Sequence, residues 1–294
     1  MNNEIFDLDD ASLEQIKILH NKYLEILKYF DEFCSEHDLR YSLLGGTLIG
    51  AVRHQGFIPW DDDVDIMMPR PDYEKLYRIW NTKSSCKDYV IVKTDEKHNY
   101  HDAGMAIKDK NTTFINKHSI NEDIVHGIGI ENMPIDAAAP TRISRIFQLL
   151  HAFNYALFNT QRLPDNKGVL IRILTRIIYF LVPSSKLRYK LWKYSENKMK
   201  KYDWKEAEHV TELIGSIKGM LITHPKNDFE NTIRMQFEDL SLQVIQGYDR
   251  YLTMIFGNYM ELPPKEERRA KHDVVYINTK ESYVKFRNKY YLID

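Results

Sequence analysis

The sequence has few of the features that would place it outside the cytosol. It holds only two cysteines, Cys34 and Cys86, which lie far apart without metal-ligand spacing, so we expect a reduced setting rather than a disulfide framework. It lacks the run of about 18 uncharged apolar residues that a transmembrane helix needs. The N-terminus, MNNEIFDLDDASLEQ, is acidic and lacks the basic start and apolar core of a signal peptide. We therefore expect a cytoplasmic protein.

Acidic residues are scarce in one part of the chain. Residues 141–201 hold thirteen Lys and Arg against two acidic residues, a net charge of +11 in a chain whose net charge is -1. Charge segregation of this kind indicates an electrostatic partner. Bulky apolar residues between the basic ones favour an anionic membrane surface, on the inner face of the cell membrane, over nucleic acid.

The same segment is predicted to be almost wholly helical. Arg172 and Arg176 share a face in the run VLIRILTRIIYFLV, which Pro183 ends. Two interpretations stay open: a helical subdomain that packs its apolar stripes internally, and an element that lies on a membrane surface. The first apolar stripe consists of Ile143, Ile146, Phe147, Leu150, Phe153 and Leu157.

The most informative stretch is residues 43–68, LLGGTLIGAVRHQGFIPWDDDVDIMM. Gly45 and Gly46 predict a tight turn that comes close to a ligand, because neither has a Cβ. The residues from Thr47 to Arg53 predict a short helix whose first N–H groups face an anion. Alone, a double glycine more often marks an ordinary turn.

Carboxylates follow this helix. If residues 63–66 form a strand, Asp63 and Asp65 share one face, because side chains alternate along a strand. Two carboxylates on one face form a site for a hard cation, and Mg²⁺ (or Mn²⁺) is the expected cofactor. An acidic run is usually a solvated turn, but the combination with the glycine turn favours nucleotidyltransferase-type chemistry. Asp61 and Asp62 are expected to be structural, although either is able to replace a ligand.

The segment GGTLIGAVRHQGFIPWDDDVDI resembles the signature of the LicD family, bacterial phosphocholine transferases related to the fukutin ribitol-phosphate transferases. AIKDKNTTF, IGIENMPIDAAAP and YDRYLTMIFGNYMELPPKEERRAKHD resemble further elements of that family. Glu131 stands where the family usually has Asp, which keeps a carboxylate and lengthens its reach by one methylene. Asn132 and Met133 replace Ile and Phe. Asn258 stands where the family usually has Asp, which removes a charge.

The resemblance implies transfer of a phospho-alcohol, phosphocholine first of all, from a CDP-linked donor to a sugar hydroxyl of a lipid-linked cell-surface glycan or teichoic-acid precursor. Glu131 would be a third metal ligand or the general base, with a structural ion pair as the alternative. The expected catalytic and metal-binding residues are Asp63, Asp65 and Glu131. The expected substrate-binding residues are Gly45, Gly46, Thr47, Arg53, His54, Trp60, Lys108 and Asp136.

The contacts expected of these substrate-binding residues differ in kind. Arg53 and Lys108 would contact phosphate, the first as a planar fork and the second as a point charge. Trp60 would stack on a base or on choline, with a core position equally open. A lone histidine such as His54 is more often structural.

Two other functions stay open. One is nucleotidylyl transfer from a nucleoside triphosphate to another acceptor, which the same metal ligands would serve. The other is a non-catalytic membrane-associated scaffold of the same fold, against which the intact Asp63, Asp65 and Glu131 argue. No nucleic-acid partner is expected.

The chain as a whole predicts an α+β fold: a nucleotidyltransferase-like mixed sheet flanked by helices, with a helical insertion. We expect a catalytic core in 1–140, the insertion in 141–205, and a C-terminal part in 206–294 that completes the catalytic domain. Helices are predicted at Asp10–His37, with Ser12 and Gln15 as a capping box, at Pro71–Trp80, and at Leu242–Phe256. Strands are predicted at Tyr41–Leu44, Tyr89–Lys93, Gly104–Lys108, Thr112–Ile115, Gly127–Met133, Leu221–Thr223 and Arg234–Phe237.

Overall fold

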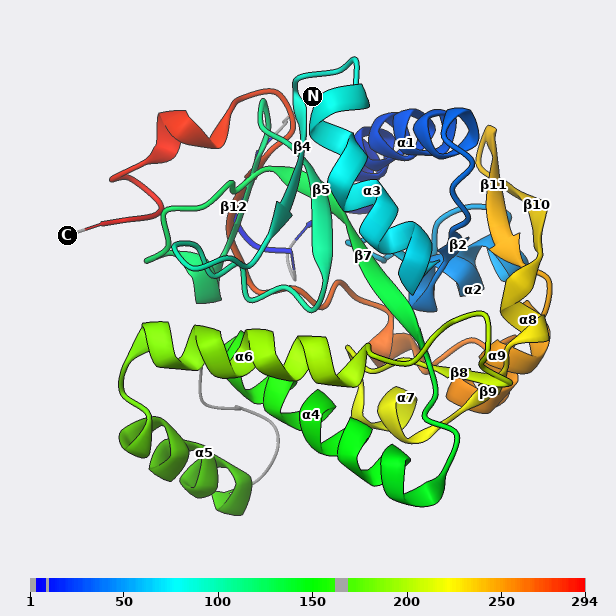
Figure 1. Ribbon diagram of the computed structural model, residues 1–294. Helices are drawn as coiled ribbons and strands as arrows, with labels where there is room; N and C mark the ends of the chain where they lie inside the picture. The colour runs from blue at the N-terminus through cyan, green and yellow to red at the C-terminus, as the bar shows by residue number, and fades with distance from the viewer. Residues whose placement is uncertain (1–3, 9–10, 162–168, 294) are drawn as a thin grey trace.

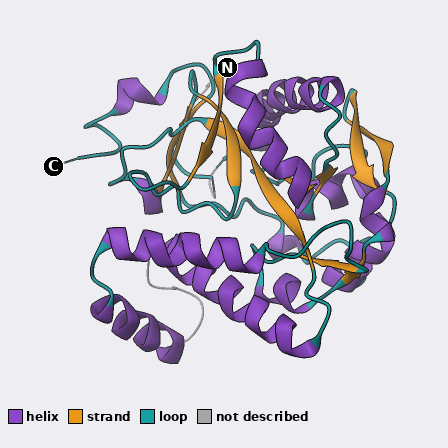
Figure 2. Ribbon diagram, in the orientation of Figure 1, coloured by secondary structure: helices purple, strands orange, loops and turns teal. Residues whose placement is uncertain are grey.

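The computed structural model describes residues 4–8, 11–161 and 169–293, and it has the expected α+β fold (Figures 1 and 2). Its largest sheet has the strand order β2-β3-β7-β5-β4, with β8 pairing the end of β7 and β9 pairing β8. The neighbours β3 and β7 run parallel and the other pairs of this sheet antiparallel. The strands are β2 (Ser42–Leu43), β3 (Asp65–Pro69), β4 (Tyr89–Lys93), β5 (Met105–Asp109), β7 (Ile128–Ala137), β8 (His209–Thr211) and β9 (His224–Pro225).

Two smaller β-structures flank this sheet. One is the antiparallel sheet β1-β12-β6, which joins the N-terminal, C-terminal and middle parts of the chain. The other is a hairpin of β10 and β11. Their strands are β1 (Glu4–Ile5), β6 (Thr113–Asn116), β10 (Thr232–Phe237), β11 (Leu240–Ile245) and β12 (Val274–Asn278).

Helix α1 (Leu13–Glu36) confirms the long helix predicted at the N-terminus. The capping box is present, because Ser12 Oγ accepts from Gln15 N at 3.2 Å and Gln15 Oε1 accepts from Ser12 N at 3.0 Å. Helix α3 (Arg70–Lys83) also agrees with its prediction and carries Pro71 in its first turn. Both helices pack against the large sheet and bury its apolar side chains (Figure 1).

Two predictions for the C-terminal part are wrong. Residues 242–245 belong to strand β11 and not to a helix, because Leu242 and Val244 alternate into the core while the chain pairs with β10. The helix α9 begins only at Tyr248 and ends at Phe256. Leu221–Thr223 is not a strand, because Leu221 ends the short helix α7 (Ile217–Leu221). The remaining short elements are α8 (Asn227–Glu230), η1 (Lys117–Ser119), η2 (Lys265–Glu267) and η3 (Tyr283–Phe286).

The middle segment is helical where the structure describes it, as predicted: α4 (Arg142–Thr160), α5 (Val169–Leu181) and α6 (Ser185–Met199). Helices α4 and α6 pack side by side below the sheet in Figure 1 and share a core that includes Tyr155 and Trp192. The ion pair Lys93–Glu196 (2.6 Å) joins β4 to α6, and the ion pair Glu74–Lys200 (2.7 Å) joins α3 to the end of α6. None of the helices within the described residues is long and apolar enough to span a membrane.

The internally packed interpretation is wrong for most of the apolar stripe predicted on α4, although Leu157 packs against the core shared with α6. Ile143 is 71% exposed and Phe147 59% exposed. The buried residues of α4 lie on the opposite side of the helix, among them Gln148, Ala152 and Tyr155. Small Ala152 lets α6 approach on that side, so the bulky stripe is left facing solvent.

A buried ion pair ties the start of α3 to the end of β7. Arg70 donates from Nε and Nη2 to the two oxygens of Asp136, both at 2.7 Å, and Asp136 is only 1% exposed. The pair satisfies both oxygens of Asp136, while Arg70 Nη1 lies 3.6 Å from Glu74 Oε1. Removal of one partner leaves a buried charge without its main counter-ion. The observed role of Asp136 is therefore to hold α3 against the sheet.

We expect Asp136→Asn to lower the free energy of unfolding by about 3 kcal/mol, because Arg70 would keep its charge in a buried position. Urea unfolding at neutral pH measures this loss. The matched control is Asp123→Asn, which opens the exposed Asp123–Arg287 pair and should leave the unfolding midpoint nearly unchanged. Equal stability of the Asp136 variant and the control would contradict a structural role.

Candidate active site

The strand register brings two of the predicted carboxylates side by side. Asp65 opens β3, and its direct partner on the parallel strand β7 is Glu131. Glu131 N donates to Val64 O at 2.9 Å, so the hydrogen bonds between the two strands extend to the position of Asp65 and Glu131. Side chains of paired residues on neighbouring strands leave the sheet on the same side. The two carboxylates therefore face the same space.

Helix α2 (Gly45–His54) begins against these carboxylates. Gly45 has φ of +54°, which favours glycine, and Thr47 Oγ1 accepts from Asp65 N at 3.0 Å. A Cβ on Gly46 would lie 2.7 Å from Asp61 Oδ2, so only glycine lets that carboxylate come so close. Leu44, which precedes the helix, has no side chain that caps it. The first N–H groups of α2 thus form a positive end beside the acidic residues.

Burial and mutual repulsion dominate the electrostatics of this site. Burial, together with the charges of neighbouring Asp63 and Asp62, raises the pKa of Asp61 to about 8. Burial likewise raises the pKa of Asp63. The pKa of Asp65 lies well above its usual range because the side chain is buried and Asp63 and Glu131 are close. Burial, with Asp102, raises the pKa of Glu131 to about 7. A bound cation would relieve this repulsion.

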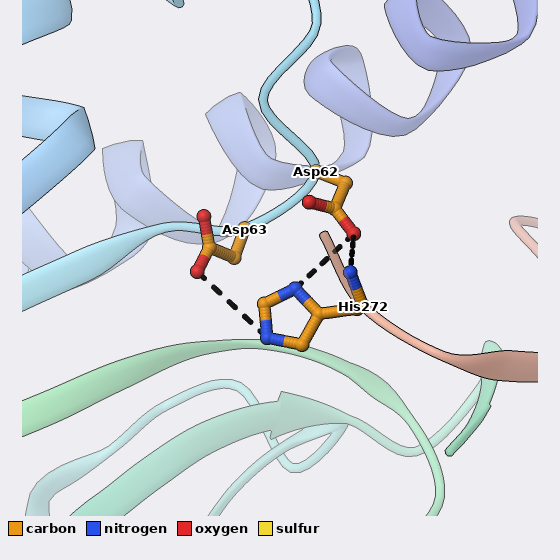
Figure 3. Close-up of side chains that lie close together, drawn as sticks. All are labelled: Asp62, Asp63 and His272. Carbon is orange, nitrogen blue, oxygen red and sulfur yellow. Dashed lines mark hydrogen bonds and ion pairs between the residues drawn. The ribbon is translucent and has the colours of Figure 1, made fainter. Parts of the chain in front are cut away.

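Within the acidic loop, hydrogen bonds from Lys271 and His272 already balance the charge of Asp62 (Figure 3). Asp62 is 1% exposed and accepts three hydrogen bonds at 3.1 Å, from Lys271 N, His272 N and His272 Nδ1. Burial opposes the charge, but the bonds from His272 lower the pKa of Asp62. The same bond raises the pKa of His272 to about 9. His272 Nε2 lies 3.9 Å from Asp63 Oδ2.

Two overlapping groups of ligands are available to a metal ion, and Asp63 belongs to both. Among the described residues, Asp62, Asp63 and His272 form the group whose ligand atoms lie within 4.8 Å of one another. The other group is the predicted set of Asp63, Asp65 and Glu131, whose ligand atoms do not all lie within that distance of one another in this structure. The chemistry of the second set fits Mg²⁺ or Mn²⁺ better, because its ligand atoms are all carboxylate oxygens. In the first, Asp62 and His272 already neutralise each other.

The structure brings most of the predicted site residues together. Gly45, Gly46 and Thr47 adjoin the acidic loop, as described above. Lys108 lies on β5, two residues from the strand partner of Glu131, and its charge opposes the rise in the pKa of Glu131. Lys108 Nζ is 3.6 Å from Asp102 Oδ2. The strand predicted at Asp63 is wrong, because β3 begins at Asp65 and Asp63 lies in the preceding loop.

Three predicted substrate contacts lie toward the other end of the site region. Arg53 is eight residues, about 12 Å, along α2 from Gly45, and its Nη1 donates to Tyr259 O and Glu261 O. Nearby, the His54 and Trp60 rings meet edge to face at 6.4 Å. The Arg268 guanidinium lies 5.7 Å from the centre of the Trp60 ring. Asp136 is at the far end of β7 in the ion pair with Arg70.

Three residues that shape the site belong to no motif that would identify them in the sequence. His272 lies more than 200 residues after Asp62, and a lone histidine carries no spacing signal. His20 and Tyr23 follow the apolar period of α1, yet they contact the acidic loop. His20 Nε2 lies 2.6 Å from Asp61 O, and Tyr23 OH donates to Asp62 O at 2.9 Å.

Comparison with known proteins is consistent with this arrangement. Residues 38–127 match the nucleotidyltransferase domain of a family described as LicD/FKTN/FKRP. A protein of Haemophilus influenzae, "Lipopolysaccharide cholinephosphotransferase LicD", is 31% identical over 257 residues, which cover 85% of this chain and 92% of that protein. An uncharacterized protein of Rickettsia prowazekii is 31% identical over 125 residues, 35% of this chain and 46% of its own. One of Rickettsia typhi is 40% identical over 68 residues, 22% of each chain.

The Asp62–His272 pair predicts a pH-dependent contribution to stability. Because folding raises the pKa of His272 from 6.5 to about 9, the pair stabilises the protein fully below pH 6.5 and loses its effect toward pH 9. We expect His272→Gln to cost about 1 kcal/mol below pH 6.5, a value that allows for the exposed third of the ring. Unfolding in urea with EDTA, at several pH values, measures the difference.

The control for this experiment is His98→Gln. His98 forms a similar pair with Asp95 at 3.2 Å, but on the exposed surface. Its substitution should cost little at any pH. A stability difference for His272→Gln that stayed constant from pH 6.5 to 9 would contradict the assigned ion pair.

Proposed function

Because the chain belongs to the LicD family, we propose that it is a metal-dependent phosphotransferase that moves phosphocholine from CDP-choline to a sugar hydroxyl. The observation that carries the proposal is the half-buried cluster of Asp63, Asp65 and Glu131 beside the first turn of α2. The proposed acceptor is a lipid-linked cell-surface glycan or teichoic-acid precursor, which places the enzyme at the inner face of the cell membrane. The Haemophilus relative acts on lipopolysaccharide, as its name states.

The proposed reaction is a displacement at phosphorus. The acceptor hydroxyl oxygen forms a bond to the phosphorus that bears choline, the bond from that phosphorus to the CMP oxygen breaks, and CMP leaves. The hydroxyl proton passes to a base. Enzymes that transfer phosphoryl groups act mostly through positioning and charge neutralisation. A cluster of carboxylates beside a helix N-terminus suits that task.

Each part of the site has a place in this reaction. Asp63, Asp65 and Glu131 would hold Mg²⁺ or Mn²⁺, which supplies positive charge for the diphosphate and the leaving CMP. The N–H groups that open α2, at Gly45, Gly46 and Thr47, would orient phosphate oxygens. Lys108, from β5, adds a cation close to Glu131. Asp62 and His272 fix the acidic loop so that Asp63 keeps its direction.

Arg53, His54 and Trp60 would contact the outer parts of the substrates. The backbone carbonyls of Tyr259 and Glu261 use Nη1 of Arg53, and Nε donates to His54 Nδ1 at 3.5 Å, which leaves Nη2 for phosphate. Trp60 presents an aromatic face for choline or cytosine, with Arg268 on one side of its ring. We propose no substrate contact through the charge of Asp136, because Arg70 occupies both of its oxygens.

The experiment that tests this function offers the protein a panel of CDP-alcohols with lipid-linked glycans and Mg²⁺. We expect CDP-choline to give a glycan heavier by one phosphocholine group, together with CMP, as measured by mass spectrometry. Transfer of the nucleotide half to the acceptor would instead identify a nucleotidylyltransferase. An absence of transfer from every donor, with folded protein and Mg²⁺ or Mn²⁺, would favour a non-catalytic scaffold.

We expect Asp63→Asn and Asp65→Asn to abolish this turnover while the protein stays folded, because each removes ligand charge from a hard-cation site. The matched control is Asp88→Asn, which changes an exposed carboxylate that lies 3.9 Å from Lys110. The control should keep normal activity. Near-normal turnover of Asp63→Asn or Asp65→Asn at saturating Mg²⁺ would refute the metal assignment.

We expect Glu131→Gln to lower kcat by about 10²-fold or more, with a smaller change in the KM for the donor, because Gln keeps the shape but neither carries a metal ligand's charge nor accepts a proton. Steady-state kinetics at saturating Mg²⁺ separates the two constants. A large rise in donor KM at unchanged kcat would show that Glu131 is not the base. A rise in the Mg²⁺ concentration required for half-maximal rate would identify it as a metal ligand.

A further inference from the structure

Helix α4 has two apolar faces, and only one of them is packed. Gln148, Ala152 and Tyr155 face the core shared with α6. On the opposite side, five large apolar residues fall within a third of the helix circumference at 100° per residue. They are exposed to between 41% and 71%: Ile143, Ile146, Phe147, Leu150 and Phe153. A row this long is unusual on a surface that meets only water.

Helix α5 extends this apolar surface. Tyr179 OH donates to Leu157 O at 2.7 Å, which fixes the inner side of α5 to α4. The outer side carries Ile173, Ile177 and Phe180, of which Phe180 is 82% exposed. Arg172 and Arg176 lie on the next row of the same helix and are also exposed. An apolar row with a basic row beside it is the pattern of a helix that lies in a membrane interface.

Helix α6 continues the surface on the other side of α4. The His151 ring of α4 meets the Tyr194 ring at 5.6 Å, and Lys198 Nζ lies 5.3 Å from the centre of the Tyr194 ring. Leu187, Lys190, Tyr194 and Lys198 share one exposed row of α6. The row thus alternates apolar and basic side chains. Figure 1 places α4, α5 and α6 together, on the side of the molecule away from α1.

The charge of this surface has one sign. Within the described part of 141–201, no acidic side chain is exposed, because Glu196 is buried between Lys93 and Lys193. The exposed basic side chains are Arg142, Arg172, Arg176, Lys186, Lys190, Lys198 and Lys201. A second copy of the same face would therefore meet like charge, which argues against a dimer through it. An anionic lipid surface matches both the charge and the apolar side chains.

We propose that the outer face of α4, α5 and α6 is a docking surface for an anionic lipid bilayer, on which the protein lies without spanning it. The apolar rows of α4 and α5 enter the interface, and the basic rows contact lipid phosphates. This inference goes beyond the transfer reaction, and it can fail while the proposed function stands. It gives the enzyme a way to reach an acceptor whose lipid part stays in the membrane.

Sedimentation with phosphatidylcholine vesicles that contain a rising fraction of phosphatidylglycerol tests this surface. Binding should rise with phosphatidylglycerol and fall as salt passes about 0.1 M, where the screening length is about 10 Å. The variant Arg172→Glu, Arg176→Glu, Lys190→Glu should bind roughly 100-fold more weakly, about fivefold for each basic side chain lost. The control reverses Lys17, Lys83 and Lys289, which are exposed on other elements, and should bind like the parent protein.

A second pair of variants tests the apolar rows. Ile143→Ser, Phe147→Ser, Leu150→Ser should lower binding roughly tenfold. Its control, Leu13→Ser, Val284→Ser, Ile293→Ser, removes equally exposed apolar residues from other parts of the surface. Circular dichroism checks that each variant is folded, and transfer to a water-soluble acceptor fragment should be unchanged in all of them. Equal binding to neutral and anionic vesicles, no binding, equal losses in the controls, or a dimer that only the α4 variant disrupts would overturn the proposal.

Discussion

Repulsion between crowded carboxylates is the constraint on which the candidate site depends. Burial raises the pKa of Asp61, Asp63, Asp65 and Glu131, and at each of them the charge of a neighbouring carboxylate adds to the rise. A folded chain tolerates such a cluster only if other groups offset it. The backbone does part of this, because the positive end of α2 faces Asp61 and Asp65. A divalent cation at Asp63, Asp65 and Glu131 would supply the rest.

The groups that hold the cluster come from the whole length of the chain. His20 and Tyr23 of α1 bond to the backbone of the acidic loop, and β7 supplies Glu131 at the register position of Asp65. His272 comes from the C-terminal part, two residues before β12 starts. Strand β12 pairs with both β1 and β6, so the N-terminal and C-terminal parts of the chain lie in one sheet. The site is therefore complete only when the sheet and the C-terminal segment are folded together.

The parts of the fold that follow a local pattern were predictable from the sequence. The period of α1, its capping box, Pro71 at the start of α3 and the strand Tyr89–Lys93 all depend on neighbours within a few residues, and all are confirmed. The helix predicted at Leu242–Phe256 is wrong for residues 242–245, because their apolar spacing suits a helix and a strand alike and pairing with β10 makes them a strand. The exposure of the apolar stripe depends on which face of α4 the helix α6 covers. The sequence of α4 alone does not indicate that face.

The candidate site divides in the same way. Gly45, Gly46, Asp63 and Asp65 lie within one short stretch, so their grouping was visible in the sequence. His272 balances the charge of Asp62, and Arg70 forms the ion pair with Asp136. Because both partners are distant in sequence, the sequence pattern did not reveal these contacts. The domain boundaries stay predictions, although Leu213, Ile214 and Met220 share the core of the helical segment.

We expect Asp63, Asp65 and Glu131, and not the Asp62–His272 pair, to hold the metal ion. A crystal structure of the protein with Mn²⁺ and CDP-choline, with the ion located by its anomalous scattering, tests this most directly. We expect Mn²⁺ bonded to oxygens of Asp63, Asp65 and Glu131, with the donor phosphates at the start of α2 and the bond between Asp62 and His272 intact. An ion bonded to His272 Nε2, with Asp65 and Glu131 unligated, would contradict this expectation.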